Sequence, residues 1–323
     1  MFRIYTPELT TSTYAAITAV HNAVWIDEPI TVEQLRHADA TWPAAYLSQR
    51  LLVEEDGKIV AAGHYFENHW QYQPGKYDFE LVVDPAHQGH GIGTAVYNYV
   101  TALLAKRTPR MTSLVISTRE DQTRALCFLA ERGFKTTMRW ARARLEIAKF
   151  DFAQFARAED RLRAADIQIY SLQELATLDA AWQHKAYTLD RVAGQDAPSP
   201  DAMSEVTFEA YVQNTFHHPG WLPEGCFAAV TRDGTWVGIT ELSRTSDPQR
   251  LTTPWTAVHP QYRRLGIATA LKVRAICFAQ AWGARIITAS NKANNPMYQL
   301  NLQLGFERLP AALTLKMRVS AER

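Results

Sequence analysis

The pattern of hydrophobic and polar positions predicts the same strands and helices twice along the chain. A short N-terminal strand is expected at 2–5 and again at 167–170, each followed by a helical stretch. Apolar runs flank the Asp-Gly pairs at 56–57 and 233–234, and such pairs favour tight β-hairpins. The order of the elements is therefore repeated within one chain.

A helix is predicted after a glycine-containing loop in each half. Helical spacing gives the first helix one apolar face, made of Ile92, Ala95, Val96, Tyr99 and Leu103. The corresponding face of the second helix is made of Ile267, Leu271, Ala275, Phe278 and Trp282. Each helix leads to an apolar run, at 113–117 and 285–289, which we expect to be a buried strand.

Each half is predicted to end with a short helix and a strand of alternating polarity. The helices stop before Gly133 and Gly305, where glycine suits a left-handed C-terminal cap. The closing strands are expected at 138–147 and 313–319. Further features are polar inserts with a helical pattern at 28–40 and 199–214, and an amphipathic connector at 148–166.

The repetition extends to individual residues. Pro85 aligns with Pro260, Gly91 with Gly266, and Thr94 with Thr269, and the two residues of each pair are the same distance apart in the sequence. A period this long indicates a whole duplicated domain and not a solenoid repeat. We therefore predict an N-terminal domain at 1–149, a connector at 150–165 and a C-terminal domain at 166–323.

Composition narrows the class of protein. The chain has 323 residues, a length that suits two domains of ordinary size. Lys and Arg number 34 against 33 Asp and Glu, so no overall field attracts nucleic acid or an anionic membrane. The three cysteines lack metal-ligand spacing, and their odd, sparse count favours a reducing compartment. With no signal-peptide pattern and no apolar run near the roughly 18 residues of a membrane span, we expect a cytoplasmic protein.

The two loops have the chemistry of an anion site. Small residues let a ligand approach the backbone, and the first N–H groups of a helix are free to donate to an anion. Neither loop has the lysine of a Walker loop, and Thr94 stands where a dinucleotide fingerprint needs its third glycine. Both loops fit the pattern [QR]-x-x-G-x-[GA] after a strand that ends in Val-x-Pro, at 88–93 and 263–268.

With these loops and the Gly-Phe helix ends, the chain resembles the GNAT superfamily of N-acyltransferases, as a tandem member with two such domains. The resemblance covers nearly all of both halves. It implies an α/β fold of the mixed α+β type. Each domain would then have a mixed, mostly antiparallel sheet flanked by helices, with a splay between its fourth and fifth strands that holds acyl-CoA.

The resemblance also implies the residues that bind acetyl-CoA as co-substrate. Backbone groups around Val83 and Val258 would hold the pantetheine arm, and the loops would hold the pyrophosphate. The residues implied in the first loop are Gln88, Gly89, His90, Gly91, Ile92, Gly93 and Thr94. Those implied in the second half are Arg263, Arg264, Leu265, Gly266, Ile267, Ala268 and Thr269, with Asn294 at the start of the following helix.

The catalytic residues are less clear from the sequence. The tyrosine acid of the family is missing, because its positions hold Leu129 and Asn301; Tyr298, nearby, reads as a packing residue. An amine with a pKa of about 10.4 costs roughly 4–5 kcal/mol to deprotonate at pH 7, so a base is valuable. Glu80 and Glu241 are the candidates, and a solvent-facing strand carboxylate is an equally good interpretation of each.

The resulting hypothesis is an N-acetyltransferase that moves an acetyl group from acetyl-CoA to the amine of a small molecule by direct attack. We expect this enzyme to have no metal, nucleic-acid or membrane partner. We favour the second half of the chain as the catalytic one. The duplication can supply within one chain the pairing that single-domain relatives achieve as dimers, so we expect a monomer. The alternative is a non-catalytic acyl-CoA sensor or scaffold of the same fold, which the missing tyrosine favours.

Overall fold

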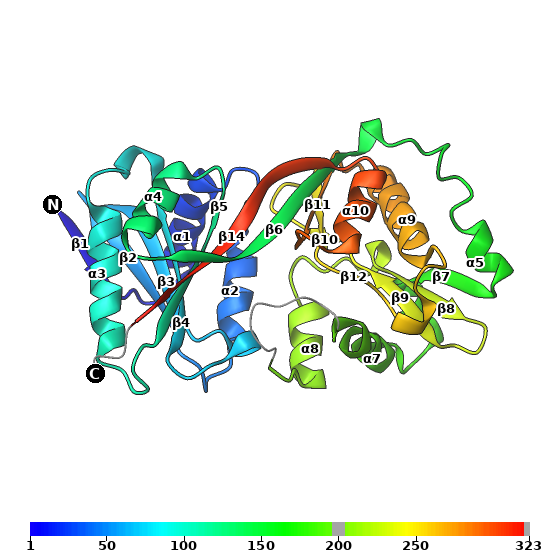
Figure 1. The fold of residues 1–323 in the computed structure, drawn as a ribbon, viewed down its shortest axis with the longest axis horizontal. Coiled ribbons are helices and arrows are strands. Elements are labelled where there is room, and N and C mark those ends of the chain that lie inside the picture. The colour runs from blue at the N-terminus through cyan, green and yellow to red at the C-terminus, as the bar shows by residue number, and fades with distance from the viewer. Residues whose placement is uncertain (196–203, 320–323) are drawn as a thin grey trace. The chain divides into compact units, whose positions relative to one another are not determined.

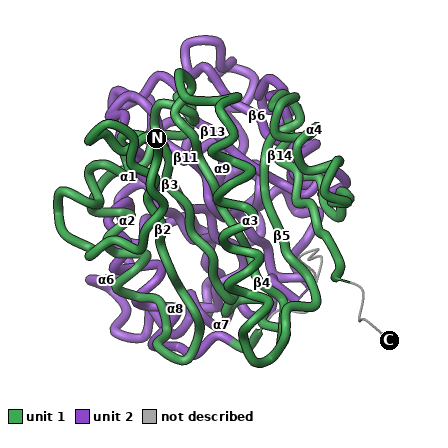
Figure 2. Tube along the Cα trace, turned by 90° about the vertical axis from the view of Figure 1, so that its left-hand side faces the viewer, with its two compact units in different colours: residues 1–139, 200–205, 311–323 green, residues 140–199, 206–310 purple. Residues whose placement is uncertain are grey.

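A computed structural model describes residues 1–195 and 204–319 of the chain; residues 199–203 of the second expected insert lie outside the described residues. The chain forms two compact units, shown in Figure 2 in green and purple. Of the described residues, unit 1 contains 1–139, 204–205 and 311–319, and unit 2 contains 140–195 and 206–310.

Unit 1 is one sheet with helices on both faces. Its strand order is β1-β2-β3-β4-β5-β14. Helices α1 and α2 pack on one face through Tyr14, Ile17 and Leu35, and α3 and α4 pack on the other. The elements are β1 (Phe2–Tyr5), α1 (Thr11–Val24), α2 (Val32–Ala40), β2 (Ser48–Glu55), β3 (Lys58–Phe66), β4 (Lys76–Val83), α3 (Ile92–Ala105), β5 (Ser113–Arg119), α4 (Thr123–Glu131) and most of β14 (Glu307–Arg318), as Figure 1 shows.

Unit 2 has two sheets, of strand order β12-β9-β8-β7 and β6-β13-β11-β10. Helices α6, α7 and α8 pack on one face of the first sheet, and α9 packs on the other. The elements are most of β6 (Lys135–Glu146), α5 (Asp160–Ala164), β7 (Ile167–Ser171), α6 (Leu172–Leu178), α7 (Trp182–Gly194), α8 (Phe208–Thr215), β8 (Phe227–Thr231), β9 (Trp236–Thr240), β10 (Ser243–Arg244), β11 (Arg250–Thr253), β12 (Thr256–Val258), α9 (Ile267–Trp282), β13 (Ile286–Lys292) and α10 (Pro296–Gln303).

Short 3₁₀ turns complete both units. They precede the loops at Pro85–His87 and Pro260–Tyr262, and three more lie at His69–Gln71, Ile147–Lys149 and Pro223–Gly225. The predicted hairpins are present as β2–β3 and β8–β9, which pair in antiparallel register. The mixed α/β fold predicted from the sequence is confirmed.

The closing strands are exchanged between the two halves of the sequence. Residues 312–318 of β14 pair with β5 in unit 1, whereas residues 140–146 of β6 pair with β13 in unit 2. The compact units therefore do not coincide with the sequence ranges 1–149 and 166–323. The reason is that alternation predicts a strand but not the partner beside which it lies. The two ranges remain a prediction about which segments were duplicated.

The predicted apolar faces of α3 and α9 each include one exposed aromatic residue, Tyr99 in the middle of α3 and Trp282 at the end of α9. Tyr99 is 37% exposed and Trp282 is 41% exposed. In α3 the fully buried row follows every fourth residue, namely Ile92, Val96, Val100 and Leu104. Tyrosine and tryptophan tolerate such positions because a ring can cover apolar surface while its edge stays in water.

Helix α9 also buries a lysine in the apolar core of unit 2. Lys272 is 4% exposed, and its Nζ lies 5.9 Å from the centre of the Phe306 ring. Burial lowers the pKa of Lys272 to about 8. At neutral pH the folded protein therefore holds a cation that its surroundings do not favour.

Replacing Lys272 with methionine is expected to raise the free energy of unfolding at pH 7 by on the order of 2 kcal/mol. Because the pKa is lower in the folded state, the unfolded chain binds more protons between about pH 8 and the ordinary value of 10.5. The native protein should thus gain stability as the pH rises through this window. Urea denaturation from pH 7 to 10.5 measures both effects. The control is Lys135→Met, which removes an exposed lysine; a Lys272→Met curve parallel to that of the native protein would contradict the assignment.

Candidate functional site

Both predicted loops lead into a helix whose first amide groups are unused. Helices α3 and α9 begin after Gly91 and Gly266, which have φ of 82° and 83° and provide no side-chain cap. The first intrahelical hydrogen bonds are donated by the N–H groups of Ala95 and Ala270. The N–H groups of the preceding three residues have no partner within the helix and are available to an anion.

A second left-handed residue shapes each loop two positions earlier. Gly89 has φ of 85°, and the aligned residue in the second loop, Arg264, has φ of 70°. This region is uncommon for residues other than glycine, and it costs arginine of order 1–3 kcal/mol. Unit 2 therefore keeps the same loop path despite the strain. Turns of this kind form concavities of amide groups that bind anions.

The first long side chain of each loop anchors the loop to the strand before it. Gln88 Nε2 donates to the carbonyl of Val83 at 3.1 Å, and Arg263 Nε donates to the carbonyl of Val258 at 3.3 Å. The two halves thus share a contact that joins the predicted pantetheine and pyrophosphate segments. The carbonyl groups of Val83 and Val258 are partly used by this anchoring.

The remaining loop residues offer mainly backbone. The side chains of Ile92 and Ile267 are buried in the cores, so only their N–H groups can reach a ligand. The residues that are exposed at the two loops are Gly89, His90, Gly91, Thr94, Arg263, Arg264, Leu265 and Gly266, and those of intermediate exposure are Gly93, Ala268 and Thr269.

Both units have the strand splay that the resemblance implies. In unit 1, the parallel pairing of β4 with β5 covers only residues 76–78, after which β4 pairs with β3 alone. In unit 2, the corresponding strand is interrupted between β11 and β12. Strand β11 pairs with β13, whereas β12 pairs with β9. One edge of β4 and of β12 is therefore free of sheet pairing beside each loop.

Glu80 lies next to a buried histidine in unit 1. It is directly opposite His64 in the register of β3 and β4, and its Oε2 lies 3.8 Å from His64 Nδ1. The other ring nitrogen of His64 lies 2.8 Å from Ser48 Oγ. Loss of solvent acts to raise the pKa of Glu80, but His64 and then the charge of Arg50 outweigh it and lower this pKa. The Glu80 side chain is 65% exposed and ionised, which makes it a weak base.

Glu241 has the opposite electrostatic setting in unit 2. It follows β9 directly, and its N–H donates to the carbonyl of Trp255 at 3.0 Å. Burial, with the charge of Asp190 on α7, raises the pKa of Glu241 to about 8. Burial also raises the pKa of Asp190 to about 6. Among the described residues neither carboxylate makes a side-chain hydrogen bond or an ion pair.

A group of aromatic side chains lies with these carboxylates. Burial, followed by the charges of Glu241 and Asp190, raises the pKa of Tyr211 on α8. The ring of Phe216 lies 5.4 Å from those of both Tyr211 and Trp221. Trp182 continues the group, and its ring is stacked 6.0 Å from that of Trp221. Partly buried carboxylates beside aromatic rings are suited to bind an ammonium group.

Asp190 and Tyr211 were not predicted from the sequence. A signal for Asp190 was present, because helical spacing places it on the same face as Ala186 and Ala193, both of which are buried. A carboxylate on a buried face is an informative observation. Tyr211 had no such signal, since a tyrosine on an apolar helix face is ordinary.

The positions at which the family has its tyrosine acid are buried in both units. Leu129 lies in the core of unit 1, and Asn301 is fully buried in unit 2, where its Nδ2 donates to Asn291 Oδ1 at 2.8 Å. The side-chain oxygen of Asn301 has no partner among the described residues. Tyr298 is also buried, in the core cluster of unit 2.

Asn294, which the resemblance places at the start of this helix, directly precedes the N-cap of α10. Asn295, not Asn294, is the N-cap, and its Oδ1 accepts a hydrogen bond from the N–H of Met297 at 2.9 Å. Asn294 precedes the cap and is exposed. A sequence pattern does not distinguish between two adjacent asparagines, because only the backbone geometry determines which of them caps the helix. Contact of Asn294 with the co-substrate remains a prediction.

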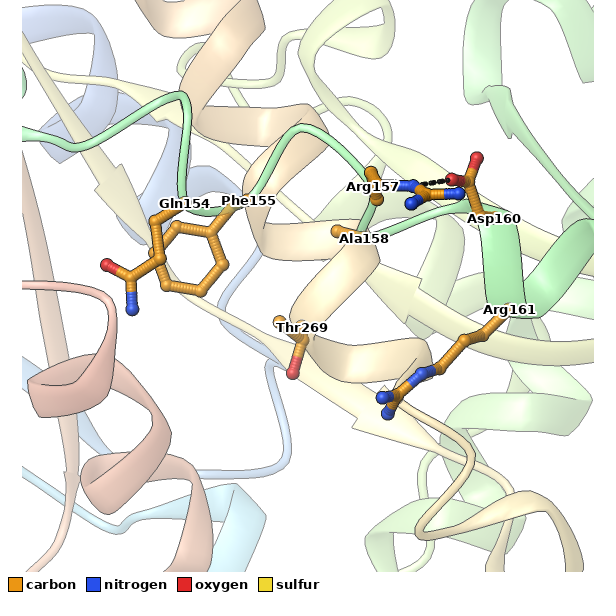
Figure 3. Close-up of a pocket in the computed structure, with 8 residues that line it drawn as sticks. Gln154, Phe155, Arg157, Ala158, Asp160, Arg161 and Thr269 are labelled. Atoms are coloured by element: carbon orange, nitrogen blue, oxygen red, sulfur yellow. Dashed lines mark hydrogen bonds and ion pairs between the residues drawn. The ribbon is translucent and has the colours of Figure 1, made fainter.

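A cavity of about 590 Å³ opens beside the first turn of α9. One wall is formed by Gly266 and Thr269, and the other by six connector residues, namely Gln154, Phe155, Arg157, Ala158, Asp160 and Arg161 (Figure 3). The described residues contain no cluster of three or more His, Cys, Asp or Glu that could hold a metal ion. None of their helices is long and apolar enough to cross a membrane.

Comparison with known proteins gives a family and several similar folds. The sequence profile of the "Acetyltransferase (GNAT) family" matches residues 14–134 and 189–306. No curated protein matches the chain. A tandem GNAT protein from the clavulanic acid biosynthesis pathway is 17% identical, with a TM-score of 0.75 and complete coverage of both chains.

Two further solved structures share the fold. A GCN5-related N-acetyltransferase from Sphaerobacter thermophilus is 16% identical over 100% of this chain and 98% of its own, with a TM-score of 0.69. N-myristoyltransferase from Saccharomyces cerevisiae with bound myristoyl-CoA is 9% identical over 99% and 79%, with a TM-score of 0.59. At these identities the likeness concerns the fold.

Proposed function

The chain belongs to the GNAT acetyltransferase family, and on this premise we propose that it transfers an acetyl group from acetyl-CoA to the amine of a small molecule. We assign the reaction to unit 2. The observation that carries this assignment is the raised pKa of Glu241, about 8, beside the splay next to β12 and beside Asp190, which makes no ion pair among the described residues. A base works best when its pKa lies near the working pH.

The loop residues fit the proposed co-substrate, which supplies the activated acetyl group as a thioester. The free amide groups at the start of α9 bind the diphosphate, with the exposed side chains of Arg263 and Arg264 beside them. The unpaired edge of β12 lies where the resemblance puts the pantetheine arm. The corresponding groups of unit 1, at the start of α3 and at Val83, bind a second acyl-CoA molecule.

Glu241 receives the proton that the attacking amine must lose, directly or through a water molecule. The neutral nitrogen then forms a bond to the carbonyl carbon of the thioester, and the carbon–sulfur bond breaks. The leaving thiolate needs little help, because a thiol of this kind has a pKa of about 8.5. The acylated nitrogen must lose a second proton to become a neutral amide, and this proton passes through water to the thiolate, since Asn301 offers no acidic proton. The missing tyrosine is therefore tolerable.

The acceptor that this proposal favours is a small amine that is positively charged before it reacts. Asp190 attracts an ammonium group to the side of Glu241, and the rings of Tyr211, Phe216 and Trp221 contact its carbon skeleton. Amino sugars, polyamines and amino-acid derivatives have this chemistry. The chain is nearly neutral, so it has no overall negative field to attract a strongly basic protein partner. Its sparse cysteines favour action in the cytoplasm.

Thiol release from acetyl-CoA across a panel of such amines tests the proposal. We expect turnover with at least one amine, and heat of binding for acetyl-CoA in calorimetry without any amine. Binding of acetyl-CoA without turnover of any amine would favour the non-catalytic sensor. The presence of Leu129 and Asn301 at the tyrosine positions supports that alternative. No binding at millimolar acetyl-CoA would contradict both functions.

A further inference from the structure

The connector between the two halves carries an arginine whose charge is not neutralised. Asp160 forms ion pairs with Arg157 and with Arg163, each at 2.9 Å. Arg161, on the same short helix α5, makes no ion pair among the described residues and is exposed at the cavity beside α9. The connector side of this cavity therefore carries a net positive charge despite the presence of Asp160.

Arg161 faces the first turn of the helix that follows the second loop. Figure 3 shows its guanidinium group and the hydroxyl group of Thr269 directed toward the same opening. Phe155 forms an apolar part of the connector wall, and its ring is stacked 5.3 Å from that of Phe150. A cation, a hydroxyl group and an aromatic ring thus border one cavity next to a cluster of free amide groups.

In unit 1, the positive charge beside the first loop and the first turn of α3 comes from helix α4. Arg132 of α4 donates to the hydroxyl group of Thr94 at 3.1 Å. A side-chain carbon added at Gly89 would lie 2.7 Å from Arg124 Nη1, so this guanidinium group lies over the loop. When the Gly-Phe helix ends are aligned, Arg124 and Arg132 correspond to Pro296 and Leu304. Unit 2 lacks both arginines, and the connector, which occurs once in the chain, supplies the charge.

We propose that the connector forms a subsite for the phosphorylated adenosine end of coenzyme A in unit 2, with Arg161 bound to the 3′-phosphate. This inference rests on the proposed function, because it takes the diphosphate to lie at the start of α9. Coenzyme A carries a third phosphate on the ribose beyond its diphosphate, together with a flat purine. The Arg161 guanidinium group suits that phosphate, and the Phe155 ring suits contact with the purine.

Calorimetry with coenzyme A and with 3′-dephospho-coenzyme A tests the subsite. The chain with Gly91→Glu, which blocks the first loop, should bind coenzyme A about tenfold more tightly than the dephosphorylated form. Adding Arg161→Ala should abolish this difference by weakening coenzyme A alone. The matched control is Arg163→Ala on the same helix, because Arg163 pairs with Asp160 and does not border the cavity; both ligands should then bind within about twofold of the parent.

Amide hydrogen exchange on the unaltered chain provides a second measurement that needs no variant. Coenzyme A should slow exchange over residues 154–164 more than its dephosphorylated form does. The subsite is wrong, while the proposed function stands, if Arg161→Ala weakens the binding of both ligands equally or of neither. The same holds if the two ligands slow amide exchange in the connector equally. If neither ligand binds the unaltered chain, the proposed function itself fails.

Discussion

Glu241→Gln is expected to lower kcat by about 100- to 1,000-fold and to leave the affinity for acetyl-CoA within about twofold. Glutamine keeps the size of the side chain but cannot accept the proton of the attacking ammonium group. With a pKa of about 8, Glu241 is mostly protonated at neutral pH, so the native kcat should rise as the pH increases through 8. The variant should lose this limb of the profile. Steady-state kinetics from pH 6 to 9.5 measures both effects.

A matched variant and a second property separate catalysis from damage to the fold. Glu209→Gln removes an exposed carboxylate from the first turn of α8 and should leave the pH profile unchanged. The pKa of Glu241 lies above its ordinary value of 4.5, so the folded protein binds more protons than the unfolded chain between pH 4.5 and about 8. Native stability therefore falls with rising pH across this window, and Glu241→Gln should remove that part of the fall. A larger kinetic loss from Glu80→Gln would reassign the reaction to unit 1.

Gly266→Glu is expected to weaken acetyl-CoA binding in unit 2 by at least about 100-fold and to abolish turnover. A side-chain carbon at Gly266 meets nothing within 4 Å, so crowding is not the cause. The loss comes instead from the φ of 83°, which disfavours side chains, and from a negative charge placed beside the diphosphate. Calorimetry and thiol release measure the two losses, with circular dichroism to verify folding.

Two companion variants decide between strain, charge and the choice of unit. Gly266→Asn tolerates the left-handed backbone and adds no charge, so its loss of affinity should be much smaller. Gly91→Glu should remove one binding event from the calorimetric curve while turnover persists. If neither glutamate variant alters binding or turnover, the two loops do not bind acetyl-CoA.

The local features were predictable from the sequence because they depend on residues close together in the chain. The Asp-Gly hairpins, the glycine loops and the order of strands and helices are examples. Glycine at 91 and 266 suits the left-handed backbone that both positions adopt. Arginine at 264 does not by itself indicate the left-handed backbone found there. Only its alignment with Gly89 suggests that conformation.

The features that were missed depend on tertiary packing. Asp190 and Tyr211 come close to Glu241 only because α7 and α8 cover the same face of one sheet. The lower pKa of Glu80 and the higher pKa of Glu241 depend on His64 and Asp190, and neither is a sequence neighbour. Two carboxylates that looked equivalent in sequence therefore have different chemistry.

The pairing of β14 with β5 has a consequence for how the protein matures during synthesis. Until the ribosome has released residues 312–318, this edge of β5 lacks the strand that pairs with it, although β5 itself ends at Arg119. Open edges can pair with foreign strands, so we expect the nascent first half to be prone to association until the last segment arrives. A gene cut into separate halves would leave each product with a vacant edge, and only co-expression would restore both.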